Sequence, residues 1–159
     1  MLCDHGNTMK TAPPPHVHVL KSRTDICTEE EVTRLVHTFY AAARDDAMLG
    51  PVFGREVKDW DEHLATLVDF WSGLLRGTMR YHGKPLAQHA QMENLTPCMF
   101  RRWLTLFFAT TESMGNAALQ EKADSIALRI AERLWKSFAE NHFPENETPH
   151  GALEDAPAA

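Results

Sequence analysis

Apolar residues recur every three or four positions along two long stretches in the first half of the chain, which is the spacing of amphipathic helices. The first stretch opens at Thr28, where Glu31 three residues later completes a capping box. The second covers residues 60–75, after a Gly50-Pro51 break. The predicted inward faces are Val32, Leu35, Val36, Phe39, Tyr40 and Ala43, then Trp60, Leu64, Leu67, Val68, Trp71, Leu74 and Leu75.

Two further helices follow the same spacing in the second half. Thr96 caps the first of them with Pro97 in its first turn, and Gly115-Asn116 starts the other, which Pro144 ends. Their predicted inward faces are Phe100, Trp103, Leu104, Phe107, Phe108 and Thr111, then Leu119, Ala123, Ile126, Ala127, Ile130, Leu134 and Phe138. No stretch alternates with a period of two, so we predict an all-α protein.

Four such helices also fit an ordinary bundle, but residues 76–96 are long for a bundle connection and carry little apolar periodicity. Within them, Pro85 starts a short helical segment that holds His89. Aromatic residues gather on three inner faces, where they line a pocket or simply form core. They are Phe39, Tyr40, Phe53, Phe70, Trp71, Trp103 and Phe107.

Two histidines lie in unlike surroundings. His63 is beside the apolar stripe of the second helix, and His89 follows the Gly83-Lys84-Pro85 break. A chain reversal between them brings the two imidazoles face to face across a slot, which suits a flat metallo-cofactor bound by one and guarded by the other. The alternative is that each is an ordinary core histidine.

Composition and net charge argue against several classes of function and partner. The chain has 159 residues, 43% hydrophobic and 24% charged, with a formal net charge of −6. This predicts one globular domain and argues against nucleic acid or an anionic membrane as partner. There is no apolar run of membrane-span length and no signal-peptide pattern, so we expect a cytoplasmic protein. Three cysteines without CxxC spacing argue against a disulfide framework or a thiolate metal site.

The helical body is expected over residues 25–144. Residues 1–24, with Pro13-Pro14-Pro15, and residues 145–159 are expected to be flexible tails. His5, His16 and His18 lie in the first tail, where a solvated tail is favoured over a metal site.

An ordered series of short motifs runs from about residue 26 to 143. It comprises Phe39-Tyr40, Arg44-Asp45-Asp46, residues 49–53 (LGPVF), 60–63 (WDEH), 70–73 (FWSG), 81–86 (YHGKPL) with His89, and 100–104 (FRRWL). In this series the chain resembles the group III truncated haemoglobins. The resemblance implies a two-over-two globin sandwich around a haem, with residues 25–144 as the globin domain.

The resemblance also assigns site residues. His89 is the implied proximal ligand of the haem iron, with His82 a nearby competitor in the preceding loop, and His63 is the implied distal histidine. Tyr40 and Trp103 are implied ligand-side donors. The implied haem-pocket residues are Phe39, Phe53, His63, Phe70, Trp71 and Trp103. The cofactor is expected to be non-covalent haem b, since no CxxCH motif is present.

The implied function is binding of oxygen, nitric oxide, carbon monoxide or peroxide at a His-ligated iron. Two hydrogen-bond donors to the bound ligand would slow its release, which favours redox detoxification of that ligand over rapid oxygen delivery. Such activity, as a nitric oxide dioxygenase or a peroxidase-like enzyme, would need a separate reductase. The alternatives are a non-catalytic protein for gas binding, storage or sensing, and a cofactor-free helical module. The protein is expected to be a monomer.

Overall fold

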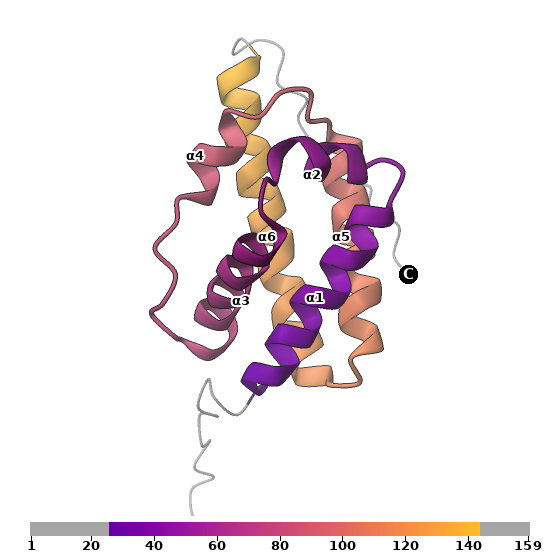
Figure 1. The fold of residues 1–159 in the computed structure, drawn as a ribbon, viewed down its shortest axis with the longest axis vertical. Coiled ribbons are helices and arrows are strands. Elements are labelled where there is room, and N and C mark those ends of the chain that lie inside the picture. Colours follow the sequence, from indigo (N-terminus) through magenta and orange to yellow (C-terminus); the bar gives the residue numbers. More distant parts are fainter. Residues whose placement is uncertain (1–25, 144–159) are drawn as a thin grey trace, which may run out of the picture.

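The computed structural model describes residues 26–143, which form helices joined by turns and loops (Figure 1). Their helices, in chain order, are α1 (Glu29–Asp45), α2 (Gly50–Glu56), α3 (Trp60–Arg76), α4 (Pro85–Ala90), α5 (Pro97–Ser113) and α6 (Ala117–His142). The all-α prediction is confirmed. The expected tails 1–24 and 145–159, with their histidines, lie outside the described residues, as does Pro144.

The long helices form two pairs stacked on each other. Helix α1 packs against α3, and α5 packs against α6. The pairs meet where α1 contacts α5 and α3 contacts α6, so one core lies between two layers of two helices. Figure 1 shows α1 and α3 in front of α5 and α6. The short α4 stands apart from this arrangement, because α6 is the one helix against which it packs.

The predicted helix starts are confirmed by their capping contacts. The Thr28 hydroxyl accepts from the Glu31 amide at 3.1 Å, and the Glu31 carboxylate accepts from the Thr28 amide at 2.8 Å. Asn116 likewise caps α6 through the Leu119 amide at 3.1 Å. Every residue of the predicted inward face of α1 is buried. The local sequence thus fixes where these helices begin and how α1 is rotated.

Two elements differ from the sequence expectation. The Gly50-Pro51 break opens the two-turn helix α2, since proline is tolerated in a first helical turn. The apolar stripe of α3 is buried only at its end, at Trp71 and Leu75, whereas Leu64, Leu67 and Val68 are half-buried. The protein itself therefore leaves part of the α3 stripe uncovered.

None of the helices within residues 26–143 has the length and apolar character needed to cross a bilayer.

Candidate functional site

Tyr40 is a buried phenol on α1 that lies among aromatic rings. Its side chain is 6% exposed, with ring centroids 4.7 Å from Phe39 and 5.6 Å from Phe53. Burial raises the pKa of Tyr40 well above its ordinary value, although a hydrogen bond with the Trp103 side chain opposes this rise. Tyr40 is therefore a neutral phenol at physiological pH, with an O–H available to donate.

Trp103 on α5 is held in a stack of rings that crosses the core. Its ring lies parallel to Phe107 at 5.2 Å, and Phe107 stacks in turn on the fully buried Trp71 of α3 at 4.8 Å. Phe39 meets Trp103 edge-on at 5.2 Å. Close packing of this kind fixes the rotamers of the rings. The indole of Trp103 is thereby kept beside Tyr40.

His63, in the first turns of α3, is wedged between two aromatic rings. It lies perpendicular to Tyr40 at 5.8 Å and to Trp60 at 5.7 Å. The Arg44 guanidinium covers the Trp60 ring at 4.3 Å, a cation–π contact. Burial, and then the nearby charge of His89, lowers the pKa of His63 below its ordinary value. His63 is thus a half-buried neutral imidazole at the edge of the aromatic cluster.

His89 on α4 has one ring nitrogen committed to the backbone. Its Nδ1 lies 2.8 Å from the carbonyl oxygen of Pro85. Because a carbonyl oxygen only accepts, this bond places the proton on Nδ1 and leaves the Nε2 lone pair free. Burial lowers the pKa of His89, although the Pro85 carbonyl and the charge of Glu56 oppose this effect. The result is a neutral imidazole oriented as metal-binding histidines usually are.

The two histidines lie near enough for the charge of one to affect the titration of the other. His82, the competing residue, lies in the loop before α4, where it lines a surface pocket with Lys84 and Gln88. His63 and His89 are therefore within electrostatic range of each other, and His82 is exposed on the surface.

The predicted site residues form two groups. Phe39, Tyr40, Phe53, His63 and Trp103 make one aromatic cluster. Phe70 and Trp71 form a second group, in which Phe70 contacts Tyr81 at 5.0 Å and Trp71 joins the first cluster through Phe107.

Sequence reasoning did not select Trp60, Arg44 or Tyr81 as site residues. Trp60 lies one helical turn before His63, so this spacing was a usable signal for its contact. No local pattern marks the contact of Arg44 with Trp60 or that of Tyr81 with Phe70, because these pairs meet only in the folded chain.

Comparisons with known proteins bear on the family and the fold of the chain. No protein-family model matches the chain. The group 3 truncated hemoglobin ctb of Campylobacter jejuni is 33% identical over 117 residues, which are 68% of this chain and 91% of that protein. The chain belongs to the group III truncated haemoglobins. The crystal structure of a group III truncated hemoglobin from Campylobacter jejuni also superposes with a TM-score of 0.64 and 29% identity, over 68% of this chain and 88% of that one.

The two stacked helix pairs are accordingly the two-over-two globin fold expected from the sequence. Membership of this globin family implies a haem cofactor and small gaseous ligands. The residues of this truncated haemoglobin fit such a group. His89 offers a neutral Nε2, and Leu67 and Phe70, four and seven residues after His63 on the same face of α3, offer half-buried apolar surface.

Proposed function

We propose that this chain binds haem b, that His89 Nε2 would hold its iron, and that oxygen, nitric oxide, carbon monoxide or peroxide would be held near Tyr40, His63 and Trp103. We further propose that it performs redox detoxification of that ligand, with electrons from a separate reductase. The haem iron, when bound, would supply the ligand-binding position and the electron transfer. The protein's part is to hold the histidine, place the donors and limit access.

The observation that carries this proposal is the buried, neutral Tyr40 phenol with Trp103 beside it. A donor in a dry pocket stabilises negative charge that develops on a ligand, at about 1.5–3 kcal/mol when the acceptor is charged. Tyr40 is well suited to this task because it cannot ionise at neutral pH. Such stabilisation slows ligand release, which favours chemistry on the ligand over transport.

His63 is proposed to act as a gate. Its imidazole lies at the edge of the aromatic cluster against Trp60, and it is less buried than Tyr40. Tyr40 already supplies a donor, and Trp103 supports it by donating to the Tyr40 oxygen, so a further donor is not needed for the ligand. The competing roles, hydrogen-bond donor and second iron ligand, differ from a gate in their spectra and kinetics.

The test is nitric oxide consumption by the haem-loaded protein in aerobic buffer, with NADPH and a flavoprotein reductase first shown to re-reduce the ferric form. Nitric oxide, dioxygen and one electron together give nitrate. We expect sustained consumption that falls in Tyr40→Phe. Consumption no faster than with NADPH and reductase alone, or unchanged in Tyr40→Phe, would point instead to gas binding, storage or sensing.

A further inference from the structure

The loop between α3 and α4 determines where His89 lies. No residue of α4 is buried, and α4 packs against α6 alone among the described helices. At the end of α4, the side-chain amide of Asn141 donates to the Ala90 carbonyl at 2.7 Å. Before it, residues 77–84 join α3 to Pro85, whose carbonyl accepts from His89. Because α4 rests on α6 alone among the described helices and buries none of its own residues, its position on α6 also depends on how its two ends are fastened.

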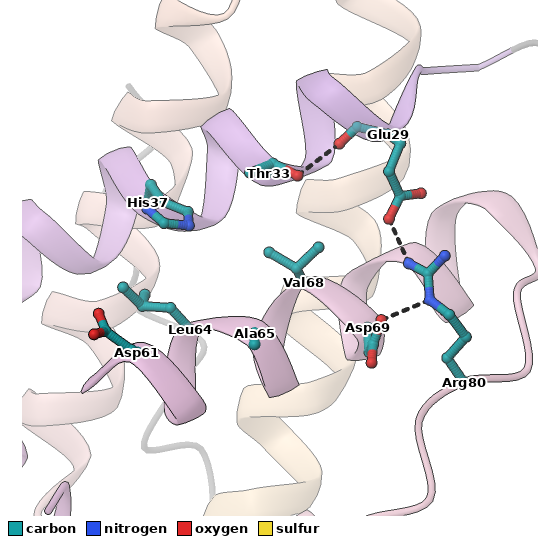
Figure 2. Close-up of a pocket in the computed structure, with 9 residues that line it drawn as sticks. All are labelled: Glu29, Thr33, His37, Asp61, Leu64, Ala65, Val68, Asp69 and Arg80. Carbon is teal, nitrogen blue, oxygen red and sulfur yellow. Dashed lines mark hydrogen bonds and ion pairs between the residues drawn. The ribbon is translucent and has the colours of Figure 1, made fainter. Parts of the chain in front are cut away.

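Arg80 fastens this loop to two helices at once. Its Nη2 donates to Glu29 Oε1 at the start of α1, and its Nε donates to Asp69 Oδ1 on α3 at 2.6 Å. Figure 2 shows the guanidinium lying between the two carboxylates, at one end of a pocket of about 390 Å³ between α1 and α3. Its planar fork suits this bridge, because two separate nitrogens meet two separate acceptors.

Glu29 is itself held in place by α3. The hydroxyl of the fully buried Ser72 donates to Glu29 Oε1 at 3.0 Å, and Arg76 Nε lies 3.1 Å from Glu29 Oε2. Arg76 also donates from Nη1 to the Cys27 carbonyl. The carboxylate that receives Arg80 is therefore fixed by its own partners.

The next loop residue adds a second attachment beside the first. Tyr81 packs edge-on against Phe70 at 5.0 Å, so consecutive loop residues contact the consecutive residues Asp69 and Phe70 of α3. The chain then folds tightly over the Tyr81 ring. A Cβ atom at Gly83 would lie 2.2 Å from Tyr81 Oη, so only glycine fits there without a shift.

We propose that Arg80 is a positioning residue for the histidine side of the site. By tying the loop to Glu29 and Asp69, Arg80 sets the place of Pro85 and, through the Pro85 carbonyl, the orientation of the His89 ring. The part of this inference that concerns haem rests on the function proposed above. The part that concerns α4 does not.

The experiment compares Arg80→Gln with Arg102→Gln. Arg102 serves as the control because it also forms an ion pair, from its Nε to Asp46 Oδ2 at 2.8 Å. Its side chain is 43% exposed, against 47% for Arg80. It joins α5 to the corner before α2 instead of to the loop before α4. Arg80→Lys keeps the charge but cannot reproduce the two-sided fork, so it should rescue only in part.

The first readout is amide hydrogen exchange in the haem-free protein. Arg80→Gln should accelerate exchange over residues 85–91 by about fivefold, which corresponds to about 1 kcal/mol. Arg102→Gln should leave exchange there unchanged. Equal exchange in both variants, or acceleration spread evenly over all helices, would overturn the proposal. Should Arg80→Gln fail to fold, Asp69→Asn removes one end of the bridge and must show the same local effect.

The second readout is the haem-loaded protein. Arg80→Gln should shift the iron–histidine stretching band of the ferrous form and speed haem loss to an acceptor apoprotein by about fivefold. Arg102→Gln should do neither. Faster exchange over 85–91 without a band shift would show that Arg80 does not position His89. If the wild-type protein takes up no haem, the proposed function fails, and the exchange result alone decides the role of Arg80 at α4.

Discussion

The two sides of the candidate site are built in different ways. On the ligand side, Phe39 and Tyr40 lie on a long helix whose inward face is entirely buried. On the histidine side, α4 has six residues, none of them buried, and one helix as its neighbour. The ligand side is part of the protein core, whereas the histidine side packs on α6 alone among the described helices and is otherwise attached by a loop and one amide contact.

This difference indicates where rigidity comes from. Packing between helices fixes Tyr40 and Trp103, because moving either would disturb the stack of rings across the core. On the other side, His89 is held by the packing of a short helix on α6 and by hydrogen bonds within and at the end of that helix. The ligand side should therefore be formed before haem binds, and the histidine side should gain most of its order from the cofactor.

The largest difference between the two sides is expected in how much a substitution lowers the free energy of unfolding. Phe39→Ala removes a fully buried ring and should lower the free energy of unfolding by about 3–5 kcal/mol. Leu86→Ala on the exposed face of α4 should change it by less than about 0.5 kcal/mol. Urea unfolding of the haem-free protein measures both. Similar losses in the two variants would refute the contrast between the sides.

Replacing His89, the proposed iron ligand, is expected to have the next largest effect. His89→Ala should weaken haem retention by about a hundredfold, or about 2.7 kcal/mol, because it removes the imidazole whose Nε2 is proposed to hold the iron. The rate of haem transfer to an acceptor apoprotein measures this. His82→Ala is the matched control and should retain haem normally. Loss of haem in His82→Ala with an unchanged ferrous spectrum in His89→Ala would reverse the assignment.

Deleting one donor on the ligand side should have a smaller effect. Tyr40→Phe keeps the ring and should speed oxygen dissociation about tenfold if the bond contributes about 1.4 kcal/mol. Trp103→Phe should act in the same direction, and the double variant should be non-additive because the two side chains interact. Stopped-flow oxygen dissociation measures all three. Unchanged rates in both single variants would remove these donors from the account.

Replacing His63, the proposed gate, should affect the rate of ligand entry more than the rate of ligand release. His63→Leu removes an imidazole that lies against Trp60 and Tyr40, so it should change the rate of carbon monoxide association more than that of oxygen dissociation. Flash photolysis gives the first rate and stopped flow the second. A wild-type ferrous form that is six-coordinate and becomes five-coordinate in His63→Leu would instead make His63 an iron ligand.

The smallest expected effect is the pH dependence of the stability that Glu29 contributes as the partner of Arg80. Partial burial raises the pKa of Glu29, but hydrogen bonds from Arg80 and Ser72 and the charges of Arg80 and Arg76 outweigh it and lower that pKa overall. A carboxylate with a lowered pKa stabilises the folded state above its unfolded pKa of about 4.3, and this stabilisation is lost as pH falls through the folded value. The stability difference between wild type and Glu29→Gln should therefore be constant near neutral pH and shrink below about pH 4. A difference that persists to lower pH would contradict this.

Local signals in the sequence predicted much of the fold. The Thr28–Glu31 capping box and the Asn116 cap are short-range contacts, and the inward face of α1 follows from helical periodicity. Helix α2 was missed because Gly50-Pro51 reads as a break, although proline is equally suited to begin a helix.

The candidate site was only partly predictable. Periodicity placed Tyr40 and His63 on inward faces, and the motif series suggested His89. The attachments of α4 were not predictable, since Arg80 meets a carboxylate 51 residues earlier and Asn141 meets a carbonyl 51 residues earlier. Contacts over such separations are specified by the whole fold and leave no periodic trace in the sequence.

The central claim, that His89 binds haem iron opposite an open ligand side, is tested most directly by the resonance Raman spectrum of the ferrous protein reconstituted with ⁵⁴Fe or ⁵⁷Fe haem. A five-coordinate spectrum is expected, with one isotope-sensitive iron–histidine band that disappears in His89→Ala and persists in His82→Ala. An iron–histidine band that survives in His89→Ala, or a wild-type protein that takes up no haem, would contradict it.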